Sequence, residues 1–370
     1  MAGTERLSRD RIDRAAAVMK EADVDTLVVY GNAWQNDCMR YVADFGILEG
    51  QGLAVMRQSG EVTLYLDSPL EADRARVESP GLTIVHVPDL VAAVGKVLAN
   101  AGNSRIAAAP MHLLPRGIAA RSAELRLTDL TPQLELLLMR KLDAEVDAIR
   151  AAAHLADEGY EVFLKAARPG RADYELVAEV EAFYRSKGVD DNFMIIGCGG
   201  TEVRGMAPPS GKRLKKGDLV TTELTPCIGG YYVQICRTLV MGEPSAAQRS
   251  AFSVYDEALE AGIAAVRHGA LASEVARAEN DVFRRHGLGD YVTDAYTRVR
   301  GHGLGLYVDT KPQILEDVHI PLEAGMTIIV HPNTYHPVVG YMVHGDALIV
   351  REDGAEVLTR TPRRLFSVPA

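Results

Sequence analysis

The order of helical and strand patterns after about residue 140 is the feature that most constrains the fold. A helical pattern without a break covers Ala144–Ala167, and Pro169-Gly170 ends it. A second helix is predicted over Tyr174–Lys187, with Gly188 as its C-cap. Strands, two further helices and a β-rich end then follow, at Phe193–Ile196, Leu219–Leu224, Tyr231–Met241, Ser245–Val266, Ala272–Arg285, Met326–Val330, Gly340–Val343, Ala347–Val350 and Glu356–Leu358. Two helices, strands, two helices and strands predict an α+β or mixed α/β arrangement, and not a continuous doubly wound sheet.

The first 130 residues form a separate α/β pattern. Helices and strands are predicted at Leu7–Ala22, Thr26–Tyr30, Gly52–Met56, Val62–Leu66, Leu82–Val87, Leu90–Ala99 and Arg105–Ala109. Ser59-Gly60 marks a hairpin turn between the predicted strands Gly52–Met56 and Val62–Leu66. A chain of 370 residues has room for two or three domains at about 100–200 residues each. We place the two domains at residues 1–135 and 136–370.

Composition excludes several classes of partner. Fifty acidic and forty basic side chains give a net charge of −10, which repels nucleic acid and anionic membranes. No run approaches the roughly 18 apolar residues that span a bilayer, and the charged N-terminus lacks the apolar region of a secretory signal. Four cysteines at no CxxC spacing indicate reduced thiols. We therefore expect a cytoplasmic protein that acts on a small-molecule substrate.

Three of the ten histidines stand in Gly- or Pro-marked settings of the β-rich end. They are His302 in Arg-Gly-His-Gly-Leu-Gly, His331 in Ile-Val-His-Pro-Asn and His344 in Tyr-Met-Val-His-Gly-Asp. A single histidine is most often a satisfied or solvent-facing side chain, as we expect for His319 and His336. Three at comparable positions indicate a site, and the last two stand at predicted strand ends.

Several motifs follow one another in a familiar order. They are Lys141 with the long helix, Arg168-Pro-Gly, Gly217-Asp-Leu-Val, Gly230-Tyr-Tyr with Arg237-Thr238, Gly301-His-Gly-Leu-Gly and Asp353-Gly-Ala-Glu-Val-Leu. Together they resemble the creatinase/prolidase/methionine-aminopeptidase family over nearly the whole chain. The resemblance implies an α+β pita-bread catalytic domain preceded by a creatinase-type α/β N-terminal domain. It also implies a homodimer, in which the N-terminal domain of one subunit approaches the other subunit's site.

The resemblance implies a changed metal site. The family's peptidases bind two divalent metals through two aspartates, a histidine and two glutamates, and these positions fall here on Glu223, Gln234, His302, His331 and His344. Two further family histidines fall on Met206 and near Asp309. Two neighbouring cations need bridging carboxylates, whereas the five positions carry one formal negative charge. On this reading the chain is a non-peptidase member of the family.

Two alternatives stay open for the site. Glu223, His302, His331 and His344 could hold one divalent transition metal, such as Zn, Fe, Mn, Co or Ni. The site could instead be metal-free, as in creatinase, with His302, His331 or His344 as the base. Creatinase's own mechanism does not carry over intact, because its catalytic histidine falls on Met206 and its pocket glutamates fall near Cys236 and at His344.

The predicted reaction is hydrolysis of a C–N bond in a small polar molecule. Glu223, His302, His331 and His344 are the predicted catalytic residues. Substrate-contacting residues are predicted at Gln234, Tyr231, Arg204, Tyr341 and Asp309. Cys236 could share the side of the strand that carries Gln234, but a buried cysteine is more often inert packing, which we favour. The alternatives are a lyase with a single metal and a binding module without activity.

Overall fold

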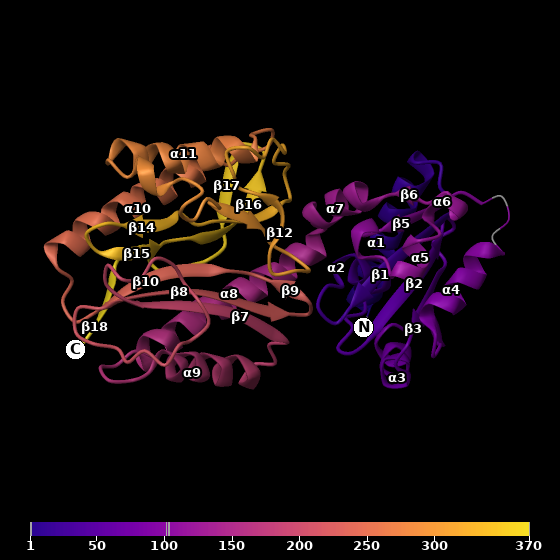
Figure 1. The fold of residues 1–370 in the computed structure, drawn as a ribbon, viewed down its shortest axis with the longest axis horizontal. Helices are drawn as coiled ribbons and strands as arrows, with labels where there is room; N and C mark the ends of the chain where they lie inside the picture. Colours follow the sequence, from indigo (N-terminus) through magenta and orange to yellow (C-terminus); the bar gives the residue numbers. More distant parts are fainter. Residues whose placement is uncertain (1, 101, 103, 370) are drawn as a thin grey trace. The chain divides into compact units, whose positions relative to one another are not determined.

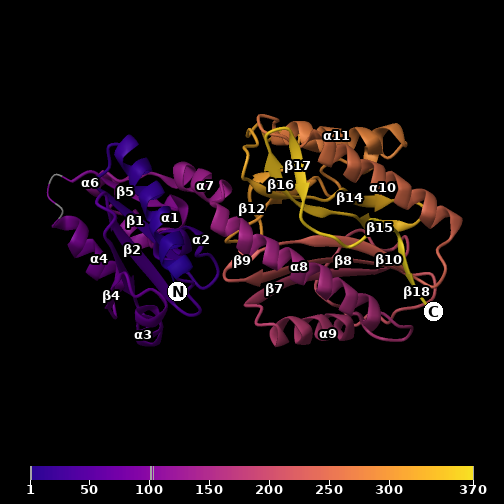
Figure 2. The same ribbon diagram turned by 180° about the vertical axis from the view of Figure 1, so that it is seen from behind.

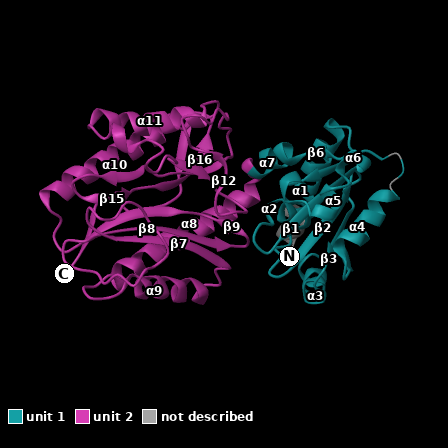
Figure 3. Ribbon diagram, viewed as in Figure 1, with its two compact units in different colours: residues 1–138 teal, residues 139–370 magenta. Residues whose placement is uncertain are grey.

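The computed structural model describes residues 2–100, 102 and 104–369, with side chains from residue 8 onward. The outermost residues of the two predicted domains, 1 and 370, lie outside this range. The chain divides into two compact units, residues 1–138 and 139–370, which are coloured separately in Figure 3. Each unit is described by itself.

Unit 1 is a layered α/β structure around one sheet with the strand order β4-β3-β2-β1-β5-β6. The strands are β1 (Thr26–Asn32), β2 (Gln51–Arg57), β3 (Val62–Leu66), β4 (Thr83–His86), β5 (Ile106–Ala109) and β6 (Thr128–Asp129). The helices are α1 (Ala2–Glu21), α2 (Asp37–Ala43), α3 (Pro69–Glu78), α4 (Leu90–Ala99), η1 (Met111–Leu113), α5 (Arg116–Ala119), α6 (Ser122–Leu125) and α7 (Thr131–Met139). The hairpin predicted at Ser59-Gly60 joins β2 to β3, and Gly60 supplies the positive φ of +87° that its turn requires.

Unit 2 contains two larger sheets and a two-stranded hairpin. The first sheet has the order β18-β10-β8-β7 with β9 on β8, the second has the order β12-β11-β13-β16-β17, and β14 pairs with β15. The strands are β7 (Asp191–Gly199), β8 (Leu219–Ile228), β9 (Tyr231–Tyr232), β10 (Ile235–Met241), β11 (Gly301–Gly303), β12 (Thr310–Gln313), β13 (Thr327–Val330), β14 (Asn333–His336), β15 (Gly340–Val343), β16 (Asp346–Arg351), β17 (Gly354–Val357) and β18 (Phe366–Val368). The predicted strand Tyr231–Met241 is thus interrupted at Val233 and Gln234.

Helices in pairs cover the sheets of unit 2. They are α8 (Asp143–Ala166), α9 (Asp173–Ser186), α10 (Ala246–Ala265) and α11 (Ala272–Arg285), with a short η2 at Gly289–Tyr291. Figure 1 and the reverse view in Figure 2 show α8 and α9 on one side of the sheets and α10 and α11 on the other. Ser245 begins α10 by a capping box, in which its hydroxyl accepts the N–H of Gln248 and the Gln248 side chain accepts the N–H of Ser245.

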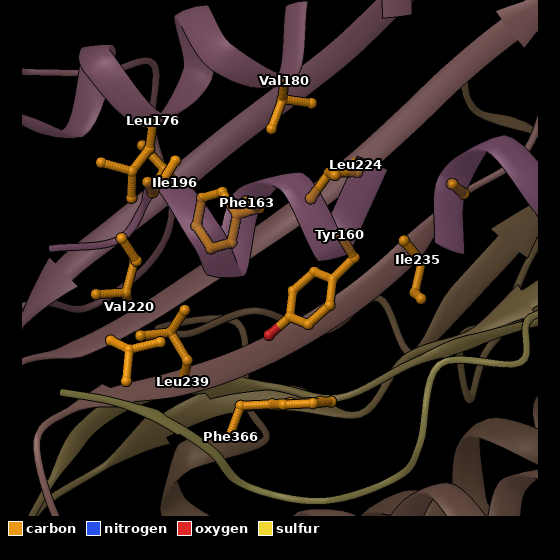
Figure 4. Packing of buried hydrophobic residues seen from close by; sticks show 14 of the residues in the cluster. Tyr160, Phe163, Leu176, Val180, Ile196, Val220, Leu224, Ile235, Leu239 and Phe366 are labelled. Atoms are coloured by element: carbon orange, nitrogen blue, oxygen red, sulfur yellow. The ribbon is translucent and has the colours of Figure 1, made fainter. Parts of the chain in front are cut away.

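The core between α8, α9 and the first sheet fixes one face of β8 and β10. Tyr160 and Phe163 of α8 and Leu176 of α9 pack against Val220 and Leu224 of β8 (Figure 4). Leu239 of β10 and Phe366 of β18 complete this layer (Figure 4). Since side chains alternate along a strand, the residues between these apolar positions face the opposite side of the sheet.

Two fully buried tyrosines of unit 2 differ in the bonding of their hydroxyl groups, which predicts opposite effects of removing them. The Tyr160 hydroxyl has no hydrogen-bond partner among the described residues, whereas the Tyr255 hydroxyl donates to the Thr334 carbonyl at 2.9 Å. We expect Tyr160→Phe to raise the free energy of unfolding by up to about 1 kcal/mol, because an unpaired buried polar group is costly. Tyr255→Phe should lower it by about 1 kcal/mol. Urea unfolding of both variants measures the difference, and an equal loss in the two would contradict this assignment.

Candidate active site

Strand alternation places Glu223 on the face of the first sheet that turns away from α8 and α9. Val220 and Leu224 of β8 belong to the core under those helices, so Glu223 projects to the other side. Cys236 of β10 stands directly opposite Glu223 in the antiparallel pair and therefore shares its face. Gln234 comes next to this pair, and its amide nitrogen donates to the Cys236 sulfur at 3.3 Å.

The second sheet brings two histidines to its own inner face. Ile328 and Val330 of β13 pack in the core with α10 and α11, so His331, one residue after the strand, projects to the opposite side. His302 of β11 pairs with Ile329 and lies on the same side as His331. The centroids of the two imidazole rings are 5.4 Å apart in an edge-to-face arrangement.

A backbone bridge joins the two inner faces. The Cys236 N–H donates to the Gly345 carbonyl at 3.2 Å, and the Gly345 N–H donates to the Cys236 carbonyl at 3.0 Å. A Cβ atom on Gly345 would lie 2.4 Å from the His331 Cβ. Glu223, Gln234, Cys236, His302 and His331 thus form one group, which we call the inner cluster.

Burial dominates the electrostatics of Glu223. Removal from water, together with the negative charge of Asp309, raises the pKa of Glu223 to about 7. A carboxyl group with this pKa exchanges a proton readily near neutral pH, so it is suited to general acid–base catalysis. Burial and the neighbouring Glu223 raise the pKa of the Cys236 thiol well above its usual value, so this thiol is neutral and not an activated nucleophile.

The hydrogen bonds of the two histidines differ. Nδ1 of His302 is 2.9 Å from the Gly303 carbonyl oxygen and 3.7 Å from the Asp309 carboxylate. Nδ1 of His331 is 2.7 Å from the amide nitrogen of Asn333, and its Nε2 has no partner among the described residues. Burial and the nearby His302 lower the pKa of His331 well below its usual value, so its ring is neutral at pH 7.

The structure does not bring His344 into the inner cluster, contrary to the prediction. Met342, two residues earlier, packs in the core under α10, and His344 faces the same way. Its ring lies 5.0 Å from the Phe252 ring, and its Nε2 is 3.3 Å from the Asp256 carboxylate. The position on this segment that faces His331 is Gly345, so the predicted four-residue metal site is not formed.

The predicted substrate-contacting residues are only partly brought together. Gln234 lies in the inner cluster, and Tyr341 lies close enough for the charge of Glu223 to help burial raise its pKa. Asp309 is half exposed and lies beside His302. Tyr231 instead points to α8, where its hydroxyl donates to Glu145 at 2.7 Å. Arg204 is exposed and lies over the Tyr335 ring, 5.6 Å from its centroid.

Sequence reasoning missed the residues that hold His331 in place. Asn333 binds the His331 ring, and the guanidinium of the buried Arg300 donates to the Asn333 carbonyl at 2.9 Å. The tripeptide His331-Pro-Asn333 carried a usable signal, because residues two apart can share a face. Arg300 stands two residues before His302, but its buried position could not be read from the sequence.

The residues of the inner cluster do not fit a pair of divalent cations. Glu223 is its single carboxylate, Gln234 is an uncharged amide, and the Cys236 thiol stays protonated. Among residues 8–369 as far as they are described, no three His, Cys, Asp or Glu side chains lie together in an arrangement that could hold a metal ion.

Comparisons with known proteins place these observations in a family. The model of metallopeptidase family M24 matches residues 147–352. The uncharacterized peptidase YqhT of Bacillus subtilis (strain 168) is 26% identical over 362 residues, which cover 96% of this chain and 99% of YqhT. A Xaa-Pro dipeptidase of Pyrococcus furiosus is 27% identical over 310 residues, 83% of this chain and 86% of the dipeptidase. The X-Pro aminopeptidase of Thermotoga maritima MSB8 has a similar fold, with a TM-score of 0.87, 20% identity, and coverage of 96% of this chain and 99% of that one.

The comparisons confirm the predicted fold and correct the predicted function. The resemblance and the pita-bread architecture with an N-terminal domain are confirmed by these similarities. The prediction of a non-peptidase member is wrong, because the relatives similar over most of both chains are named peptidases. That prediction gave single ligand positions more weight than the similarity of the whole chain. No helix in the described part of the chain is long and apolar enough to cross a membrane.

Proposed function

Since the chain belongs to metallopeptidase family M24, we propose that it is a peptidase that hydrolyses dipeptides or other short peptides at the inner cluster. The main support for this function is the buried carboxyl group of Glu223, whose pKa of about 7 suits a general base at neutral pH. The similarity to a Xaa-Pro dipeptidase and to an X-Pro aminopeptidase favours peptides with proline in the second position. The hydrolase class is supported by the family match itself.

The proposed reaction uses groups of this chain for proton transfer. Glu223 accepts a proton from a water molecule while the oxygen of that water bonds to the scissile carbonyl carbon. The same carboxyl group returns the proton to the amide nitrogen as the C–N bond breaks, so a carboxylic acid and an amine are released. Nδ1 of His302 donates to the Gly303 carbonyl, so in the neutral imidazole Nε2 carries the lone pair and can orient the water.

The comparisons support a divalent metal in general, because the family is one of metallopeptidases. The side chains of the inner cluster do not fit a pair of divalent metal ions, since they lack the paired carboxylates that two cations need. No step of the proposed reaction therefore passes through a metal.

Hydrolysis of defined dipeptides tests this function. We expect Ala-Pro and Met-Pro to yield free amino acids faster than Ala-Ala, measured by chromatography of the products. A Glu223→Gln chain purified in parallel controls for contaminating peptidases. Absence of hydrolysis of all three dipeptides by the wild-type chain, both without metal and with Mn²⁺, Co²⁺ or Zn²⁺ added, would overturn the proposal.

A homodimer and a cytoplasmic location are also proposed. The family resemblance supports the dimer, and light scattering after size-exclusion chromatography tests it. Cys38, Cys198 and Cys236 are buried thiols outside any disulfide bond, which agrees with a reducing compartment. Cell fractionation tests the location.

A further inference from the structure

The amide of Asn333 has a fixed orientation. Its nitrogen is 3.0 Å from the Val299 carbonyl oxygen and 2.8 Å from the His331 carbonyl oxygen. Carbonyl oxygens only accept hydrogen bonds, so the NH₂ side of the amide must face them. The opposite orientation would bring the Asn333 amide oxygen against two carbonyl oxygens. Arg300, fully buried, holds the Asn333 backbone by its hydrogen bond to the carbonyl.

The fixed amide determines the tautomer of His331. The same amide nitrogen is 2.7 Å from Nδ1 of His331, so its two hydrogens are shared among this ring nitrogen and the two carbonyl oxygens. An amide nitrogen does not accept hydrogen bonds, so a proton on Nδ1 would point at it without a partner, and Nδ1 must carry the lone pair. In a neutral imidazole the proton then resides on Nε2. His302 has the opposite arrangement, because its Nδ1 faces the Gly303 carbonyl and must carry the proton. The two adjacent rings therefore offer one N–H and one lone pair.

This arrangement is the reverse of the one a metal ligand needs. A ligating histidine gives the metal the lone pair of one nitrogen, and its other ring N–H donates to a carbonyl, a carboxylate or water. His331 accepts at Nδ1 and carries its proton at Nε2. That Nε2 is buried and has no hydrogen-bond partner among the described residues. An unpaired buried donor is unfavourable, so a ligand oxygen placed against it would stabilise the site.

We infer that His331 is a hydrogen-bond donor to a carbonyl or carboxylate oxygen of the substrate, and not a metal ligand, with Asn333 as the positioning residue that fixes its tautomer. The peptide nature of that substrate rests on the proposed function, whereas the tautomer does not. Both oxygens have the same acceptor chemistry, and they belong to different parts of a dipeptide. The scissile carbonyl gains negative charge during hydrolysis, whereas the C-terminal carboxylate is charged throughout.

The tautomer can be read directly in the wild-type protein. Two-bond ¹H–¹⁵N correlation spectra of the chain with ¹⁵N-labelled histidine, recorded at pH 7.5, distinguish a protonated Nε2 from a protonated Nδ1. The His331→Gln variant assigns the His331 signals by their disappearance. We expect protonated Nε2 for His331 and protonated Nδ1 for His302. A protonated Nδ1 on His331 would overturn the inference, whether or not the protein hydrolyses peptides.

Asn333→Asp should reverse the tautomer, because a carboxylate accepts a proton from Nδ1 and leaves the lone pair on Nε2. We expect the spectrum to switch and kcat/KM for Ala-Pro to fall about 10- to 100-fold, the size typical of changes behind an active side chain. Asn100→Asp, at an exposed position of unit 1, adds the same charge as a control and should change neither. A folded Asn333→Asp variant with an unchanged His331 spectrum would overturn the positioning role. If this variant does not fold, the wild-type spectrum still decides.

Two substrates identify the oxygen. In His331→Ala, loss of a donor to the scissile carbonyl should lower kcat equally for Ala-Pro and its C-terminal amide, by about 100-fold. Loss of a donor to the carboxylate should raise KM for Ala-Pro alone. An unchanged kcat and KM for both substrates in a folded His331→Ala variant would overturn substrate binding by His331. Should the wild-type chain lack peptidase activity, the proposed function fails on its own, and the shift of the His331 Nε2 proton on adding Ala-Pro tests binding.

Discussion

Replacement of Glu223 by glutamine is expected to lower kcat/KM for dipeptide hydrolysis about 10²- to 10⁴-fold, the range typical of lost general acid–base catalysis. Glutamine keeps the size and the polarity of the side chain, but it cannot accept the proton of the attacking water. Cys236 stands directly opposite Glu223 on β10 and is a neutral thiol, so it cannot replace the carboxylate. Steady-state kinetics with Ala-Pro measures the loss. Glu352→Gln, an exposed carboxylate, is the matched control and should keep full activity.

The pH dependence gives this prediction a direction. A general base works in its ionised form, and the pKa of Glu223 is about 7, so kcat/KM should rise as pH increases through about 7 and level off above. The titratable and charged groups that act on Glu223 or its neighbours are Asp309, Cys236, Tyr341 and Arg300. Asp309→Asn removes a negative charge, so the midpoint should move to lower pH. A profile that is flat, or that falls between pH 6 and 8, would contradict the role of Glu223.

The helices of unit 2 could be predicted from the sequence because their limits are set locally. The predicted helix Ala272–Arg285 coincides with α11, and Ser245–Val266 differs from α10 by one residue at each end. Capping side chains and glycines lie within a few residues of the ends that they fix. The interruption at Val233 and Gln234 could not be predicted, because the contacts there are long-range: the Tyr232 N–H donates to the Gly305 carbonyl, far along the chain.

The sequence singled out candidate residues but not the directions in which their side chains point. The sequence predicted His302, His331 and His344 together, since all three stand in Gly- or Pro-marked settings of the β-rich end. The chain leaves β15 at Val343 and enters β16 at Asp346, so His344 and Gly345 lie between the two strands. Only one of these two residues can face the inner cluster. Gly345 bridges to Cys236 of the other sheet, so His344 is directed to α10. A pairing between distant strands therefore determined which residue joins the inner cluster.

The function was mispredicted for a related reason. The changes at Glu223, Gln234 and His331 were read as loss of peptidase activity, although the relatives similar over most of the chain are named peptidases. These residue changes indicate which groups the site contains, but they do not determine which reaction it catalyses. One carboxylate with a pKa of about 7 and two histidines of opposite tautomer can transfer a proton and bind an oxygen. These abilities depend on burial and hydrogen bonding, which single residue types do not reveal.

Arg237→Met is expected to lower the free energy of unfolding by about 3–5 kcal/mol, the typical cost of breaking a buried ion pair. Arg237 and Asp346 are both fully buried, and the guanidinium is 2.6 Å from the carboxylate. The same guanidinium donates to the carbonyls of Gly345, Cys236 and Thr361 at 2.6, 2.9 and 2.7 Å. Methionine fills a similar volume but leaves the Asp346 carboxylate and these carbonyl oxygens without the hydrogen bonds that Arg237 donates. Arg249→Met is the control, since its partner Glu243 is exposed and such pairs contribute about 0–1 kcal/mol.

The pH dependence of unfolding separates the ion pair from simple packing. Burial alone would raise the pKa of Asp346, but Arg237 and Arg363 outweigh it and hold the pKa below its usual value. A carboxyl group with a lowered pKa stabilises the fold above its unfolded pKa, near 4, and this stability is lost as pH falls through the lower folded value. Urea unfolding between pH 7 and pH 3 should therefore show a smaller acid-induced loss in Arg237→Met than in the wild-type chain. Equal losses in both would mean that the charge of Asp346 does not depend on Arg237, because Arg363, 2.6 Å from the other carboxylate oxygen, suffices to hold it.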